Sequence, residues 1–238
     1  MQKAWENCLE KGISTQDLQA FVKTPFLGGL WFKEEAGELL LQRSSSVEEV
    51  LFVIENMRSL RLKAWDKLWE IEPTAHALVR VIKWTRSLRR KAWMKLLQMG
   101  PDRDDLMTVI EKARNLRWEA WRKLIEIGPT NENLEEIIRY RHGKMKYEAT
   151  KRLLSQRPSN RQLGTIMLYG NSRKLTLESM EVLISNNPDM EDIKSIYHHY
   201  QMIIPVSKRK RRLKHEAWDK FKDTPEGQLK SLRRIKLF

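Results

Sequence analysis

One short segment recurs along this chain at a nearly constant interval, and that interval limits what the chain can fold into. The segments RSLRLKAWDKLWEIEPT, RSLRRKAWMKLLQMGPD and RNLRWEAWRKLIEIGPT follow one another at steps of 28 residues, each with a small residue before a tryptophan. The same small-residue column continues in both directions, at Ala4, Ala36, Ala64, Ala92, Ala120, Ala149, Ser179 and Ala217. Self-similarity with a period of 20–50 residues is typical of repeat proteins, in which one helical or strand unit is stacked many times.

The residues around the small column predict the first helix of each repeat. Apolar residues stand four positions before and four positions after it, as Leu88 and Leu96 do around Ala92. Residues four apart lie on one face of a helix, and a small residue at the centre of that face lets a neighbouring helix approach closely. Each repeat should therefore contain a helix that buries this face.

A proline nine positions after the small residue predicts where the first helix ends. Pro101 is followed by Asp102, and the other repeats carry Thr, Ser or Asp at the same place. Proline cannot continue the helix, and these side chains are preferred N-caps of a new one. The apolar residues Leu106, Val109 and Ile110 then predict a short second helix.

Because a 28-residue helix pair cannot bury its apolar stripe alone, the pairs should stack on one another. We predict an all-α fold, a right-handed α-solenoid of about seven helix-pair repeats. Residues 1–35 would form an N-terminal capping repeat, 36–206 the bihelical repeats, and 207–238 a basic C-terminal capping repeat and tail. The pattern resembles the HEAT-like class of bihelical solenoids in architecture only. The resemblance implies an extended binding surface and does not choose the ligand.

The composition favours an anionic partner. The chain has 45 Lys+Arg against 31 Asp+Glu, a net charge of +14, which predicts attraction to polyanions such as nucleic acid. Cys8 is the only cysteine, which fits a reducing compartment. No apolar run approaches the ~20 residues that cross a bilayer, so we expect no membrane partner and a cytoplasmic protein.

Two basic columns recur at the start of the first helix. Arg58, Arg86 and Arg114 stand six positions before the small residue, and Arg61, Arg89, Arg117 and Lys146 stand three before it. The residues between them, Ser59, Ser87 and Asn115, are predicted helix caps. A cation near a helix N-terminus costs about 0.3–1 kcal/mol, so its recurrence indicates a partner. The partner is either intramolecular, such as the last carbonyls of the preceding helix, or the phosphates of a ligand.

Two further features add to the basic columns. Trp84 and Trp118 lie outside the tryptophan column that follows the small residue, which is expected to pack between repeats, and they are candidates for stacking on unpaired bases. From residue 207 onward there are 12 Lys+Arg and 4 Asp+Glu. This tail contains the cluster Lys208, Arg209, Lys210, Arg211, Arg212 and Lys214. The cluster is a nucleic-acid contact, a nuclear import signal if the source is a eukaryote, or a solvated loop.

The sequence contains no motif that predicts catalysis. None of the five histidines has metal-ligand spacing with a second ligand, and FLGGLWF is explained more simply as a turn than as a phosphate loop. We therefore expect a non-enzymatic protein with no metal or cofactor. The first hypothesis is a nucleic-acid-binding solenoid, with RNA slightly preferred to DNA, that holds phosphates with the two basic columns and the 208–214 cluster. The alternative is a scaffold or adaptor subunit that binds an acidic protein within a larger complex.

Overall fold

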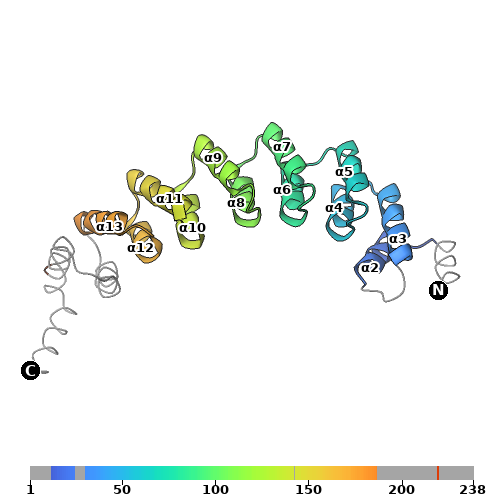
Figure 1. Cartoon of the computed structure of the whole chain (residues 1–238), viewed down its shortest axis with the longest axis horizontal. Helices are drawn as coiled ribbons and strands as arrows, with labels where there is room; N and C mark the ends of the chain where they lie inside the picture. Colours follow the sequence, from blue (N-terminus) through green and yellow to red (C-terminus); the bar gives the residue numbers. More distant parts are fainter. Residues whose placement is uncertain (1–11, 25–29, 142, 187–218, 220–238) are drawn as a thin grey trace, which may run out of the picture. The chain divides into compact units, whose positions relative to one another are not determined.

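The computed structural model describes residues 12–24, 30–141 and 143–186, together with Asp219, and every regular element in these ranges is a helix (Figure 1). The helices that carry the small-residue column, called A-helices here, are α3 (Leu30–Arg43), α5 (Arg61–Glu70), α7 (Arg89–Met99), α9 (Arg117–Ile127), α11 (Gly143–Ser155) and α13 (Arg173–Ser185). The shorter B-helices are α2 (Thr15–Lys23), α4 (Val47–Asn56), α6 (Ala75–Trp84), α8 (Arg103–Lys112), α10 (Asn131–Tyr140) and α12 (Asn160–Tyr169).

The B-helices from α4 to α12 begin where the Thr, Ser and Asp residues predicted them to begin. The side chain of each N-cap accepts a hydrogen bond from the backbone N–H three residues later; Asp102, for example, accepts from Asp105 at 2.8 Å. The N-caps are Ser46, Thr74, Asp102, Thr130 and Ser159. These bonds satisfy backbone donors that the first turn of a helix leaves without partners.

The prediction that Ser59, Ser87 and Asn115 cap the A-helices is wrong. Helix α7 begins at Arg89 with Leu88 as its N-cap, without a side-chain capping bond, and α5 begins in the same way after Leu60. Both leucines are buried in the core. Burial of the leucine fixes where the chain enters the A-helix, and the serine before it stays exposed in the turn.

The helices pair in a different order from the one that the sequence predicted. Each A-helix packs most closely on the B-helix before it, as in α6 with α7 and α8 with α9, and not on the B-helix that follows its proline. The unit is therefore a B–A hairpin closed by a turn such as residues 85–88 (Figure 1). The proline segment instead connects one hairpin to the next, because Gly100 turns the chain away with a φ of 75°.

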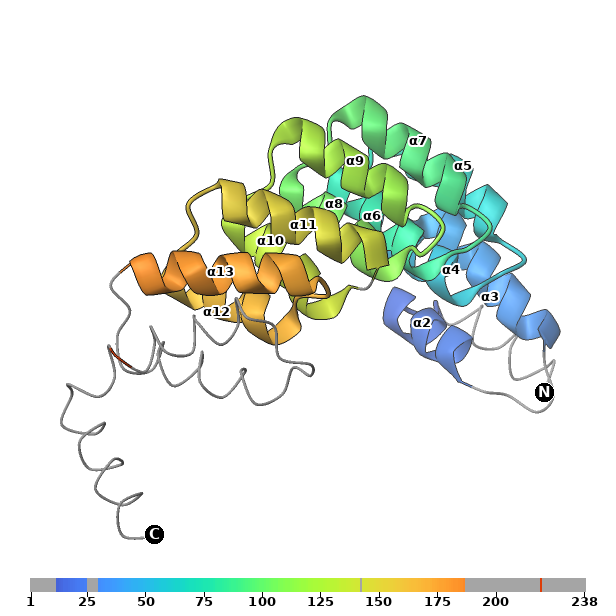
Figure 2. The same ribbon diagram turned by 60° about the vertical axis from the view of Figure 1, so that its left-hand side comes forward.

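The chain divides into two compact units, Met1–Ile127 and Gly128–Phe238. In the first unit the B-helices pack on one another in chain order, α4 on α6 and α6 on α8, and Figure 2 shows α5, α7 and α9 side by side in front of them. In the second unit α10 packs on α12, and α11 on α13. The predicted all-α solenoid of sequentially stacked helix pairs is confirmed. No described helix is long and apolar enough to span a membrane.

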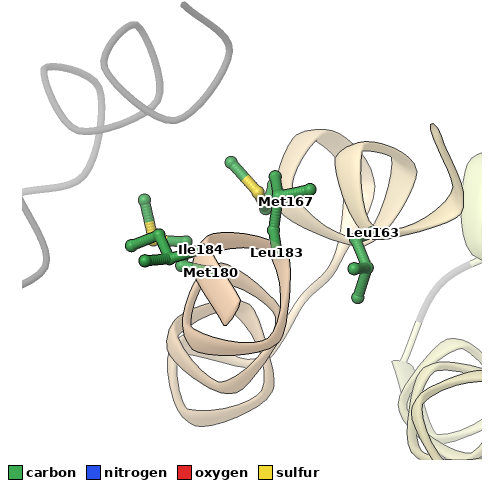
Figure 3. Packing of buried hydrophobic residues seen from close by; sticks show 5 residues of the cluster. All are labelled: Leu163, Met167, Met180, Leu183 and Ile184. Carbon is green, nitrogen blue, oxygen red and sulfur yellow. The ribbon is translucent and has the colours of Figure 1, made fainter. Parts of the chain in front are cut away.

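The small-residue column lies at the centre of the core, as its spacing predicted. Ala64, Ala92, Ala120, Ala149 and Ser179 are fully buried. The tryptophans that follow three of these alanines, Trp65, Trp93 and Trp121, are also buried, down to 1% exposure at Trp93, which confirms their predicted packing role. In the second unit Leu163 and Met167 of α12 meet Met180, Leu183 and Ile184 of α13 in one apolar cluster (Figure 3).

Polar contacts reinforce the stacking of the B-helices. Arg80 of α6 donates hydrogen bonds to two carboxylates of α4, Glu48 at 2.5 Å and Glu55 at 2.9 Å. Burial by itself lowers the pKa of Arg80, but the bonds to Glu48 and Glu55 outweigh it, so the pKa is raised above its ordinary value. The guanidinium thus stays charged and links two neighbouring hairpins.

Candidate nucleic-acid interface

Three of the turns that close hairpins in the first unit contain no carboxylate. We call the three segments 57–62, 85–90 and 113–118 the turn edge; their sequences MRSLRL, TRSLRR and ARNLRW contain seven arginines and no Asp or Glu. Carboxylates such as Glu72, Asp102 and Glu132 stand at the opposite ends of the helices, around the prolines. The three turn segments themselves therefore carry only positive charge, although Glu119 directly follows the third segment and pairs with Arg90.

The arginine column nearest the A-helices is held by the protein itself. Nε of Arg61, Arg89 and Arg117 donates to the carbonyl oxygens of Ile54, Ile82 and Ile110, at 3.0, 2.8 and 2.8 Å. These carbonyls belong to the last turn of the preceding B-helix, where the helix dipole favours a cation. This offsets the cost of placing the same cation at the start of an A-helix. The partner of the Nε groups in this column is therefore intramolecular, as the first of the two alternatives predicted.

The second arginine column has no such partner. Arg58, Arg86 and Arg114 are exposed at the beginning of each turn. Within the described part of the chain their guanidinium groups make no hydrogen bond or ion pair. Some other exposed cations of this unit are paired, such as Arg90 with Glu119 and Lys63 with Glu38, whereas Lys91 and Arg122 are exposed without a described partner. The three unpaired arginines recur once per hairpin.

Two exposed tryptophans accompany these arginines. Trp84 ends α6 and is 56% exposed, and Trp118 in the first turn of α9 is 42% exposed. Nζ of Lys83 lies 4.9 Å from the centroid of a Trp84 ring, within the range of a cation–π contact. Both tryptophans thus differ from the buried column represented by Trp93 and remain available to a flat ligand.

Lys146 does not share the exposure of the unpaired arginines. It is 7% exposed, and its Nζ donates to the carbonyl oxygen of Tyr169 at 2.8 Å. Burial lowers the pKa of Lys146. Because the side chain is buried and one of its three N–H donors is held by the Tyr169 carbonyl, Lys146 positions helices and is not open to a phosphate. The predicted contacts in the cluster at 208–214 lie outside the described residues.

The sequence patterns singled out no exposed aromatic residue in the second unit, yet its described residues include three. Tyr140 ends α10, Tyr169 ends α12, and Tyr147 lies in the second turn of α11. The signal that could have found them is their register: Tyr140 stands ten residues after the cap Thr130, as Trp84 does after Thr74.

An open depression of about 340 Å³ lies between α7 and α9 of the first unit. Its lining residues are Trp93, Leu97, Glu119, Arg122, Lys123 and Glu126. Glu119 accepts hydrogen bonds from Arg90 at 2.6 Å and from the Trp93 indole at 2.9 Å, so its charge is already compensated. The mixed charges of this lining give no preference for an anion. No three potential metal ligands cluster among the described residues.

No protein-family model, no curated protein and no solved structure matches this chain. The class of protein is therefore defined by the structure itself, as an all-helical repeat protein built from B–A hairpins.

Proposed function

We propose that this protein binds nucleic acid through the turn edge of its first unit. The observation that carries the proposal is the set of exposed, unpaired arginines Arg58, Arg86 and Arg114, one on each of three successive hairpins. Guanidinium groups bind phosphate through paired N–H donors. Packed helices lie ~8–10 Å apart, so a charge repeated on each hairpin suits a partner that carries charge at regular intervals.

The absence of carboxylates from the turn edge adds to the attraction. Turn segments that carry only positive charge, within a chain of net charge +14, raise the local concentration of a polyanion. We place RNA slightly ahead of DNA, because Trp84 and Trp118 suit unpaired bases, which RNA exposes in loops and single strands. On this proposal the molecule is a HEAT-like solenoid of cytoplasmic location, and its 208–214 cluster supplies further phosphate contacts.

The test measures binding of the full chain to a labelled, mixed-sequence single-stranded RNA by fluorescence anisotropy between 50 and 300 mM salt. If six to eight phosphates are neutralised, the slope of log affinity against log salt is about −4 to −6. Changing Arg58, Arg86 and Arg114 together to Glu should weaken binding at least about tenfold and flatten the slope by about 2. The fold should be retained, since these side chains bond to no described residue.

A matched variant controls for net charge. Arg103, Arg122 and Arg152 are exposed arginines outside the turn edge, and changing them to Glu alters the net charge equally. We expect this variant to lose much less affinity. Equal loss in both variants, or no binding by the wild type at low salt, contradicts the proposal.

Exposed apolar side chains favour the second candidate, a scaffold for an acidic protein partner. Leu62 is exposed on the turn edge itself, beside the arginines. A stoichiometric protein that stays bound through nuclease treatment would support the scaffold. A ratio of absorbance at 260 to 280 nm that is high and falls on nuclease treatment would support the nucleic-acid function.

A further inference from the structure

The exposed aromatic residues of both units occupy two equivalent positions of the repeat. Trp84, Tyr140 and Tyr169 each stand ten residues after the N-cap of their B-helix, and Trp118 and Tyr147 stand two residues before the small residue of their A-helix. The exposed fractions of the three tyrosines are 65% for Tyr140, 42% for Tyr147 and 44% for Tyr169. Each hairpin from α6–α7 to α12–α13 thus presents at least one exposed aromatic ring where its B-helix ends or its A-helix begins.

In the second unit, the structure brings the ends of three helices together at these tyrosines. The carbonyl of Tyr169, at the end of α12, accepts from Lys146, the residue before Tyr147. The Tyr169 ring lies 5.7 Å from the guanidinium of Arg139, the residue before Tyr140. The side-chain amide of Asn171 donates to the carbonyl of Gly143 at 2.8 Å, which joins the last turn to the start of α11. The three tyrosines therefore stand at helix ends that meet one another, and we call this part of the surface the tyrosine edge.

The charge of the tyrosine edge suits an anionic partner. Its segments 141–147 and 170–177 contain no Asp or Glu. The side chains of Arg141 and Lys174 make no hydrogen bond or ion pair with another described residue. Lys144 is exposed and lies 3.7 Å from Glu148 in the same helix, a separation that leaves it only loosely held.

Aromatic rings beside unpaired cations are suited to binding a single-stranded nucleic acid. Each base offers a π-face that stacks on an aromatic ring whatever its sequence, while the cations follow the phosphates. In a duplex the bases are already stacked on one another and are not accessible to these rings. An apolar peptide would instead use the exposed Leu168 beside Tyr169 as readily as the rings themselves.

We propose that the tyrosine edge is a second binding surface, on which unpaired bases stack against Tyr140, Tyr147 and Tyr169, and that the ligand is therefore single-stranded. This inference rests on the proposed nucleic-acid function and assigns its substrate class. The tyrosines bind by stacking, which does not select bases by sequence, so binding should tolerate changes of base.

The experiment compares a labelled single strand with a duplex of the same sequence, using the full chain. Tyr140→Ala with Tyr147→Ala should weaken single-strand binding at least about fivefold per ring, because base–aromatic stacking has that effect or more. Duplex binding should not change. Tyr169 is left intact, since its ring and carbonyl hold Arg139 and Lys146. The matched pair Tyr140→Phe with Tyr147→Phe keeps the rings and should bind within about twofold of the wild type.

The other outcomes distinguish the inference from the function on which it rests. If the alanine pair binds the single strand as the wild type does, while the Arg58, Arg86 and Arg114 variant has lost binding, the tyrosine edge is overturned and the nucleic-acid function stands. If Leu168→Ala weakens binding as strongly as the alanine pair, the surface is a general apolar contact and the inference is overturned. If the wild type binds neither nucleic acid, the proposed function fails first and the inference with it. A retained helical circular-dichroism spectrum verifies the fold of each variant.

Discussion

At the scale of single residues, two arginines three positions apart in the same turn are in opposite environments. Arg89 is partly buried, and its guanidinium donates to the carbonyl of Ile82 and, at 3.1 Å, to the side chain of Asn115 in the next hairpin. Arg86 is exposed and bonds to no described residue. One arginine therefore contributes to folding, and the other remains available to a ligand.

The same substitution, arginine to methionine, should affect stability differently at these two positions. Arg89→Met should lower the free energy of unfolding by about 1–2 kcal/mol, because it removes two charge-assisted hydrogen bonds and leaves the Ile82 carbonyl without this donor. Arg86→Met should change it by less than about 0.5 kcal/mol. Urea denaturation of the two variants checks this, and equal effects would contradict the assignment of their roles.

At the scale of helices and turns, the residue before each proline determines how one hairpin joins the next. This residue has a positive φ in four successive connections, as Gly100 at 75° and Gly128 at 81°, but also as Glu72 at 52° and Arg157 at 53°. Glycine adopts this left-handed backbone without a steric cost, whereas a residue with a side chain is strained. Two of the four connections therefore contain removable strain.

Replacing the strained residues with glycine should stabilise the protein. Glu72→Gly and Arg157→Gly are each expected to raise the free energy of unfolding by a few tenths to about 1 kcal/mol, the strain relieved exceeding the added entropy of the unfolded chain. The reverse change, Gly128→Ala, should lower it by about 1 kcal/mol. Thermal melts measure all three, and an increase in stability for Gly128→Ala would be incompatible with a steric origin.

At the scale of the whole molecule, the described helices pack on elements that are close to them in the chain. Each hairpin of the first unit contacts its immediate neighbours, and the chain divides into two compact units at residue 127. In such an architecture, stability is a sum of repeat and neighbour contributions, so a defect should have its strongest effect where it occurs.

Leu96→Ala tests this locality. Leu96 is fully buried in α7, and the cavity should lower the free energy of unfolding of the first unit by about 2–5 kcal/mol. Tryptophan fluorescence reports mainly on this unit, because Trp218 is the one tryptophan beyond residue 127. Amide hydrogen exchange in α12 and α13 reports on the second unit and should change much less. Equal loss of protection in both units would show that they unfold together.

Sequence reasoning identified the helices, the buried columns and the caps of the B-helices, because each depends on local spacing. It paired each A-helix with the B-helix that follows it, whereas the A-helix packs on the B-helix before it. Proline identifies a break between helices but does not determine which helix packs on which. The prediction of caps in the turns was wrong for a related reason. Ser87 has the chemistry of an N-cap, yet burial of Leu88 decides where the helix begins.

In the candidate site, too, some features follow from the sequence and others from tertiary packing. The sequence by itself determined the repeat, the excess of basic residues and the recurrence of arginine at two positions, because these follow from order and composition alone. Only the tertiary structure decided that Arg89 reaches a carbonyl seven residues back, that Lys146 is buried, and that the helix ends carrying Tyr140, Tyr147 and Tyr169 meet. Hydrogen bonds and burial depend on which helix ends meet, and packing between the helices sets that.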